Sequence, residues 1–184
     1  SGIKLYPGLE GYDRVQKACY TAESKKMPIV AHCSPGGIRA SGCSLAAAKA
    51  RNSPWWLSEA LQAGLSLRVV LAHAGGRDAW VRARITGAET AIDRILRDTM
   101  PGLSEYPTSW VGVDTAYHEA QDADDYRLAL SRLPGWYAGR VLPGSDWPLH
   151  MPEYSYSSWA DATRRAWAGW DVDFQEALQS LFEF

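Results

Sequence analysis

The sequence predicts an α/β protein with a parallel sheet, arranged either as an open, doubly wound sheet or as part of a (β/α) barrel of the TIM type. Short apolar runs alternate with amphipathic stretches over the whole chain of 184 residues. Alternation of this kind is typical of parallel strands covered by helices. No G-x-G-x-x-G follows the first apolar run, so the fingerprint of a dinucleotide-binding sheet is absent. About five strands are predicted, which is too few to close an eight-stranded barrel.

The first half of the chain is predicted to contain two strands and two helices. Residues 2–6 (GIKLY) form the first strand, which ends at a Pro-Gly pair, and residues 28–32 (PIVAH) form the second. Between them, residues 12–25 carry apolar side chains at helical spacing. Residues 33–51 are rich in glycine and serine and are predicted to be a long loop. A helix then begins at a Ser-Pro pair and is predicted over residues 53–63.

The second half of the chain continues the same alternation. Its clearest buried strand is LRVVLAH, and a proline weakens the pattern of its last strand, RVLPGS. The predicted strands are residues 67–73, 110–115 and 140–145, and the predicted helices are residues 86–98, 122–133 and 157–182, the last broken near Gly169.

Composition and charge restrict the classes of partner. The 19 basic and 21 acidic residues give a net charge of −2, so there is no basic excess to attract nucleic acid or a membrane surface. No apolar stretch approaches the roughly 18–20 residues that span a bilayer, and no secretory leader is visible. Three cysteines without metal-type spacing argue against a disulfide framework and favour a reducing compartment, predicted to be the cytoplasm.

Polar side chains recur where the predicted strands end. His32, His73, Asp114 and Asp146 each close an apolar run. In parallel α/β folds the carboxyl ends of the strands meet at one edge, where ligands bind. A single histidine of this kind is more often a core residue bonded to a backbone carbonyl, but successive strands here share the feature. Two imidazoles and one carboxylate are a ligand set typical of Zn²⁺ or a similar divalent ion.

These motifs resemble one enzyme family. GIKLYP, PIVAHCSPGG, VVLAHAGG, GVDTAYH and VLPGSDWPLH, in this order, are similar to the amidohydrolase superfamily, most closely to the amidohydrolase-2 (amidohydrolase-related) metal-dependent hydrolases. The resemblance covers nearly the whole chain and matches barrel strands four to eight only. It implies that residues 1–184 form a single partial (β/α)-barrel domain, the C-terminal portion of an amidohydrolase-like barrel.

The resemblance also assigns roles to three of the strand-end residues. His32 matches a metal ligand on the fifth strand. His73 matches a sixth-strand histidine that ligates the metal or acts on the substrate or the bound water. Asp146 matches an eighth-strand aspartate that is both ligand and proton acceptor. The implied cofactor is zinc, with manganese or iron as alternatives, and the implied reaction is hydrolysis of an amide, ester or lactone, or a related decarboxylation, through metal-activated water.

One departure from the family pattern limits these expectations. The family carries an H-x-H pair on its first strand, and no H-x-H occurs in this sequence. Because metal affinity depends on ligand count and geometry, the isolated chain is expected to hold a metal weakly or not at all. The alternative is a non-catalytic barrel fragment that works as a binding or assembly module or has no independent activity. In that case a homo-oligomer or the missing N-terminal part of the barrel would complete the fold.

Further residues near the predicted strand ends are candidates for contact with a small-molecule substrate. Each could instead have a purely structural role. The lysine could lie along its strand, the arginines could be surface charges, the histidines could be exposed in loops, and the aromatic residues could pack in the core. The candidates are Lys4, Tyr6, Arg39, Arg77, His118, Trp147 and His150. Cys33 beside His32 is interpreted as a small buried residue and not as a nucleophile, because no activating partner is visible.

Overall fold

The computed structural model of the protein describes residues 1–34, 39–99, 105–106, 108–114, 116, 139–142, 144, 161, 165, 179 and 181. For residues 77, 78, 80, 83 and 84 it describes the backbone only. The helix predicted at residues 122–133 lies outside the described residues, and so does nearly all of the helical region predicted at residues 157–182.

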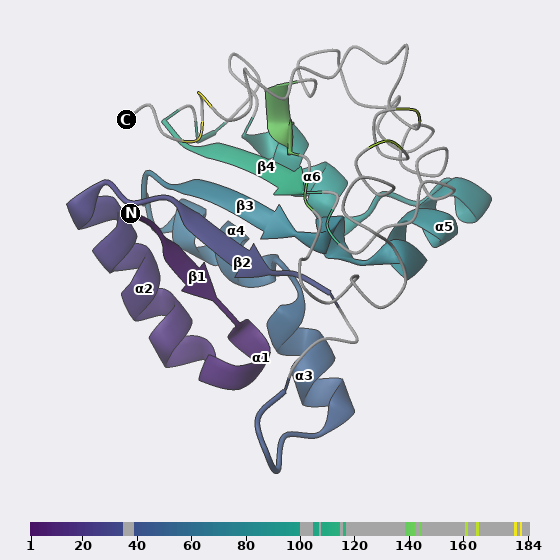
Figure 1. Ribbon diagram of the computed structural model, residues 1–184, viewed down its shortest axis with the longest axis horizontal. Coiled ribbons are helices and arrows are strands. Elements are labelled where there is room, and N and C mark those ends of the chain that lie inside the picture. Colours follow the sequence, from purple (N-terminus) through teal and green to yellow (C-terminus); the bar gives the residue numbers. More distant parts are fainter. Residues whose placement is uncertain are drawn as a thin grey trace.

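Five parallel strands form one sheet whose spatial order follows the chain (Figure 1). The strands are β1 (Ile3–Leu5), β2 (Ile29–His32), β3 (Arg68–Ala72), β4 (Trp110–Asp114) and β5 (Val141–Leu142). Every neighbouring pair is parallel, with registers such as Lys4 opposite Val30 and Val30 opposite Val70. A doubly wound sheet reverses its strand order at a switch point, whereas a β/α barrel does not. The uninterrupted order of the described strands therefore favours the partial barrel.

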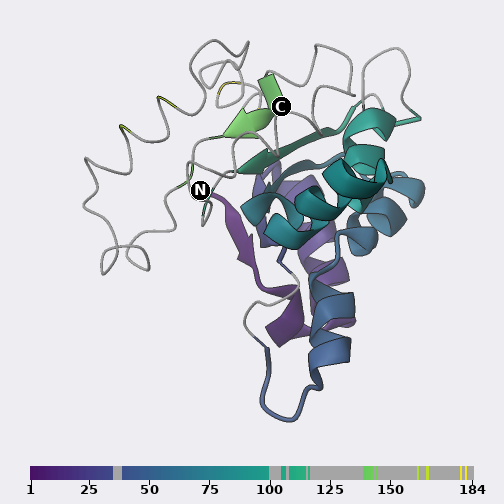
Figure 2. The same cartoon turned by 90° about the vertical axis from the view of Figure 1, so that its right-hand side faces the viewer.

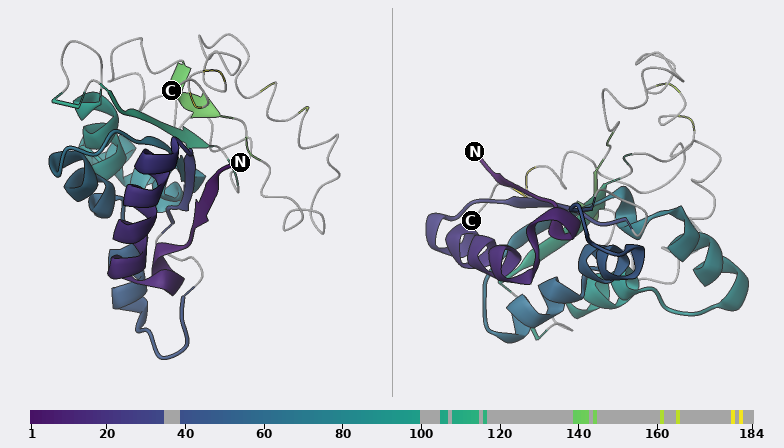
Figure 3. Two further views of the ribbon diagram at one scale, coloured as in Figure 1. Left: turned by 90° about the vertical axis from the view of Figure 1, so that its left-hand side faces the viewer. Right: turned by 90° about the horizontal axis from the view of Figure 1, so that it is seen from below.

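Helices follow the strands and lie on one face of the sheet (Figures 2 and 3). Helices α2, α4 and α6 supply most of the apolar side chains that cover this face. The helices are α1 (Pro7–Glu10), α2 (Tyr12–Lys25), α3 (Leu45–Asn52), α4 (Trp55–Gln62), α5 (Arg77–Thr86) and α6 (Ala91–Asp98), with a 3-10 turn, η1, at His73–Gly75. None of the described helices has the length and apolar character that a membrane span requires.

Alternation along the strands sends side chains to two different layers. Odd-numbered strand residues such as Ile29, Val69 and Leu71 pack against the helices, in a core that includes Leu57 and Ile95. Even-numbered residues face the other way, where a smaller apolar cluster forms on the side that is interior in a barrel. Its members are Val70, Trp110, Leu142 and Leu181. Because side chains alternate with a period of two residues, His32 at the end of β2 falls on this interior side.

The prediction at residues 33–51 was wrong. The loop predicted at residues 33–51 contains helix α3 (Leu45–Asn52), which forms because its LAAAKARN sequence is rich in strong helix formers. Ser44 caps this helix, with its Oγ accepting a hydrogen bond from the Ala47 N–H at 3.1 Å. The first strand ends before the Pro-Gly pair, as predicted, and this pair begins a short helix, α1, that was not predicted, with proline at the first helical position.

The helix predicted at residues 86–98 begins only at Ala91, and residues 77–86 before it form a separate helix, α5, that was not predicted. Helix α5 ends at Thr86, and Gly87 follows with a φ of +69°, a conformation that suits glycine. Helix α6 begins after Thr90, whose hydroxyl accepts from the Asp93 N–H at 3.0 Å, while the Asp93 carboxylate accepts from the Thr90 N–H at 2.8 Å. This reciprocal capping fixes the start of α6 beside the strand ends.

Replacing Thr90 by alanine is expected to lower the free energy of unfolding by about 1 kcal/mol, because the Asp93 N–H loses its acceptor. Urea denaturation of the variant and the wild type measures this difference. Thr21→Ala is the control, since the Thr21 hydroxyl only donates to the Lys17 carbonyl within α2. Its effect is expected to stay within about 0.5 kcal/mol, and equal losses in the two variants would contradict the capping role.

Candidate functional site

The two strand-end histidines meet at the carboxyl edge of the sheet. His73 Nε2 lies 3.0 Å from His32 Nδ1, and the ring centroids are 4.7 Å apart with an interplanar angle of 67°. Both residues are buried, with 8% and 7% of their surface exposed for His32 and His73 respectively. The structure therefore brings together the two histidines that the sequence singled out.

A strained turn aims the His73 ring at His32. Strand β3 ends at Ala72, one residue earlier than predicted, and His73 and Ala74 have φ values of +61° and +44°. Had the strand continued, His73 would face the helices, because odd-numbered residues of β3 do so. Left-handed backbone at two residues other than glycine costs free energy, so the surrounding contacts must hold it.

Asp114 at the end of β4 holds that turn. Its Oδ1 accepts hydrogen bonds from the backbone N–H groups of His73 at 2.8 Å and Ala116 at 3.1 Å. Burial raises the pKa of Asp114, and the bonds from these two N–H groups, together with the charges of His73 and Lys4, oppose that rise. The sequence placed Asp114 at a strand end but gave it no role. The signal was there, since an apolar strand ending in aspartate has the same form as the strands that end in histidine.

The backbone carbonyl of Ala116 selects the tautomer of His73. His73 Nδ1 lies 3.1 Å from this oxygen, which can only accept, so Nδ1 carries the proton. With His73 neutral, Nε2 is then an acceptor, and the Nδ1–H of His32 donates to it. Such an outer hydrogen bond to a carbonyl is the usual way in which proteins orient a metal-binding histidine.

Tyr6 and Lys4 extend the cluster along β1. The Tyr6 ring stacks on His32 with centroids 5.9 Å apart and an interplanar angle of 25°. Lys4 is exposed, and its Nζ lies 5.4 Å from the centroid of the Tyr6 ring. The structure thus places a cation, an aromatic ring and two imidazoles side by side along the edge of the sheet. A role for Lys4 and Tyr6 in substrate binding stays a prediction.

The remaining predicted site residues are not brought to this cluster by the described structure. Arg39 is exposed, and the structure gives it no contact with either histidine. Arg77 begins α5, but its side chain is outside the description. Asp146, His118, Trp147 and His150 lie outside the described residues.

Cys33, next to His32, is buried, which confirms the prediction that it is a small buried residue. Burial, with a smaller contribution from the charge of Asp114, raises the pKa of its thiol to about 12. A thiol with so high a pKa is protonated at neutral pH and is a poor nucleophile.

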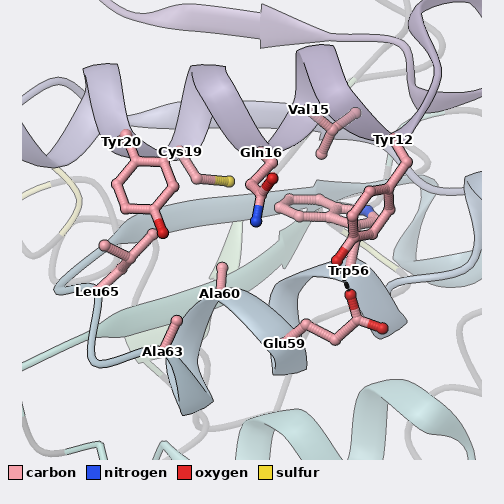
Figure 4. Close-up of a pocket in the computed structure, with 10 residues that line it drawn as sticks. All are labelled: Tyr12, Val15, Gln16, Cys19, Tyr20, Trp56, Glu59, Ala60, Ala63 and Leu65. Carbon is pink, nitrogen blue, oxygen red and sulfur yellow. Dashed lines mark hydrogen bonds between the residues drawn. The ribbon is translucent and has the colours of Figure 1, made fainter.

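The pocket drawn in Figure 4 lies elsewhere, between helices α2 and α4. The Tyr12 hydroxyl donates to the Glu59 carboxylate across its mouth. Burial raises the pKa of Cys19 in its wall to about 11, so this thiol is also protonated at neutral pH. The pocket is formed by the packing of two helices on the face of the sheet opposite to the histidines.

The histidine pair fits as one part of a metal site. Two nitrogens about 2.0–2.1 Å from a tetrahedral zinc ion lie roughly 3.3 Å from each other. The facing nitrogens of His32 and His73 are 3.0 Å apart. A slight increase in the separation of the two rings would therefore admit the ion in place of the proton between them. Among the described residues no set of three or more His, Cys, Asp or Glu side chains is grouped to hold a metal. The predicted third ligand, Asp146, is not among those residues.

Comparisons with known proteins support the fold. No family model matches the chain, and no curated protein does. Two solved structures of an amidohydrolase from Burkholderia multivorans are similar, one with bound HEPES and one with bound zinc, each with a TM-score of 0.51. Their sequence identities to this chain are 16% and 15%. The match covers 98% of this chain but 60% of the other, so the chain has the fold of part of an amidohydrolase barrel, as predicted.

In the metal-free protein, His73 is expected to be protonated at Nδ1 and unprotonated at Nε2 while it is neutral. Long-range ¹H–¹⁵N NMR of the imidazole rings distinguishes the two tautomers by their nitrogen shifts. The assignment follows from the carbonyl of Ala116, which accepts and cannot donate. A neutral His73 ring with its proton on Nε2 would contradict the arrangement.

Replacing Asp114 by alanine is expected to reduce the free energy of unfolding by about 1–3 kcal/mol, because two backbone N–H groups lose a buried acceptor. Asp114→Asn keeps the Oδ1 acceptor and should lose less. Urea denaturation measures both variants, with Asp98→Ala as the control at a surface carboxylate. Equal losses in the alanine and asparagine variants would contradict the role of the oxygen as acceptor.

Proposed function

We propose that the protein is part of a metal-dependent hydrolase of amidohydrolase type, which cleaves an amide, ester or lactone with a metal-activated water. The contact between His32 Nδ1 and His73 Nε2 carries this proposal. It lies at the carboxyl edge of a parallel sheet, where β/α barrels place their catalytic residues. The likeness to an amidohydrolase barrel supports it, as does the zinc reported in one of those structures. A related decarboxylation would use the same edge.

In this proposal His32, His73 and Asp146 would hold the ion, which when bound lowers the pKa of a water ligand to about 7. The outer contacts prepare the two rings for this task. The carbonyl of Ala116 keeps the His73 proton on Nδ1, so that Nε2 presents its lone pair toward His32. Tyr6 packs on His32 and limits the rotation of that ring. Asp146 would accept the proton of the attacking water.

Lys4 is the proposed contact for the polar end of the substrate. Its ammonium group lies over Tyr6, which itself stacks on His32, so the charge stands beside the histidine pair without touching it. A cation in that place would attract a carboxylate or carbonyl oxygen of the substrate. Arg39, Arg77, His118, Trp147 and His150 stay candidates for further substrate contacts.

A second candidate function is a binding or assembly module. Two observations favour it. Strand β1 is an edge strand of the described sheet. The chain also spans about 60% of the length of the solved structures that it matches. Open sheet edges recruit further strands. Under this candidate, a second copy or the rest of a barrel packs beside β1, and measurement of the mass in solution by light scattering tests it. A monomer at all protein concentrations would count against self-assembly.

The hydrolase proposal predicts zinc binding that depends on both histidines. His32→Ala and His73→Ala are each expected to lower the zinc content of purified, zinc-loaded protein at least about tenfold, because each removes one of few ligands. Elemental analysis measures the metal, and hydrolysis of a panel of chromogenic esters and lactones measures activity. Cys43→Ser, which removes a partly exposed thiol away from the pair, is the control and should retain zinc. Equal, low zinc in the wild type and both histidine variants would rule out the proposed site.

A further inference from the structure

A second cavity lies behind the histidines, on the helix side of the sheet. It has a volume of about 160 Å³ and lies between α3, the beginning of α6 and the backbone that follows β2 and β3. Cys33, Ala74 and Gly75 form the wall nearest to the sheet. We call this space the helix-side cavity. The side chains of His32 and His73 do not line it, so it is distinct from the candidate metal site.

Asn52 contributes a buried hydrogen-bond donor to this cavity. The residue is 1% exposed, and its Oδ1 accepts from the Gly8 N–H at 2.8 Å, which fixes the orientation of the amide. The Nδ2 group of the same amide is buried and has no acceptor among the residues that the structure describes. Asn52 lines the cavity and Gly8 does not, so we infer that the Nδ2 edge is the one turned toward the cavity. A buried donor of this kind calls for a water or a ligand to satisfy it.

The first turn of α6 contributes two more donors. The reciprocal cap of Thr90 and Asp93 satisfies the N–H groups of those two residues only. The N–H groups of Ala91 and Ile92 belong to the set that a helix leaves without internal acceptors, and both residues line the cavity. The carboxylate of Asp93 already offsets part of the positive end of the helix dipole, so these donors act mainly through direct hydrogen bonds.

Lys49 supplies a positive charge at the mouth of the cavity. It stands three residues before Asn52 on α3, so the two side chains project from the same side of that helix. Lys49 is exposed, lines the cavity and forms no ion pair with a described carboxylate. Glu89, which precedes Thr90 in the chain, is paired with Arg94 and Arg97. Among the described residues that line the cavity, Lys49 is therefore the one that carries a charge.

We propose that the helix-side cavity binds a small oxyanion, the carboxylate or phosphate group of a small molecule. The Nδ2 of Asn52 and the N–H groups of Ala91 and Ile92 would donate to its oxygens, and Lys49 would supply the opposite charge. The walls of Cys33, Ala74 and Gly75 leave room for a short aliphatic part. Binding needs neither the metal nor the hydrolase substrate, so the proposal stands or fails independently of the proposed activity.

Isothermal titration calorimetry with sodium phosphate and with sodium acetate, at constant ionic strength set by sodium chloride, tests the proposal on the full chain. Saturable binding of at least one anion is expected, and the stronger of the two identifies the phosphate or the carboxylate as the preferred group. Lys49→Gln should weaken the binding about tenfold, which corresponds to one charge-assisted contact. Lys17→Gln makes the same charge change on the exposed side of α2 and should leave the affinity unchanged.

Asn52→Asp is the sharper variant. It keeps an oxygen to accept from the Gly8 N–H but replaces the Nδ2 donor by a carboxylate oxygen that repels an anion, so binding should be lost. If this variant does not fold, the comparison of Lys49→Gln with Lys17→Gln decides alone. Absence of saturable binding of either anion at about 10 mM, or equal affinities in the two lysine variants, would overturn the proposal.

Discussion

The contact between the two buried imidazoles is the constraint on which the site depends. A hydrogen bond between His32 Nδ1 and His73 Nε2 requires one nitrogen to donate and the other to accept. The acceptor for His73 Nδ1, the carbonyl of Ala116, decides which is which. That carbonyl comes from the segment after β4, and Asp114, the last residue of β4, holds the His73 backbone. Three neighbouring strands thus fix one pair of rings, and the pair keeps its geometry only while all three stay in register.

The two faces of the sheet divide the molecule into two chemical regions. On the interior side, Lys4, Tyr6 and the histidines follow one another at the carboxyl edge. On the helix side, the apolar core of β2, β3 and β4 packs under the helices, and the helix-side cavity opens where that core reaches the strand ends. Cys33 and Ala74 directly follow His32 and His73 in the chain, so each region borders the same two backbone segments. Any ligand of the cavity would therefore contact the chain neighbours of the two histidines.

Local sequence patterns predicted the regular elements where one physical signal dominated. Residues 12–25 form a helix with the predicted bounds, because apolar spacing and the absence of proline agree there. The strands β2, β3 and β4 lie within the predicted runs, since β-branched and apolar residues are concentrated in them. The prediction failed at α3. The glycines and serines of residues 33–44 led to the prediction of a loop, although the alanine-rich stretch that follows them favours a helix. It failed again at residues 86–98, where the capping pair of Thr90 and Asp93 was not recognised.

The sequence by itself determined that apolar strands end in histidine or aspartate, because strand ends can be read from short runs and their polar neighbours. The alternation of apolar runs with amphipathic stretches predicted a parallel α/β fold, and the polar strand ends selected His32 and His73. Only the tertiary structure decided that the strands follow chain order, that Asp114 anchors the His73 backbone and that Asn52 reaches Gly8 from 44 residues away. Such contacts join segments distant in sequence. The left-handed turn at His73 also depends on them, since the local preference of histidine would not produce it.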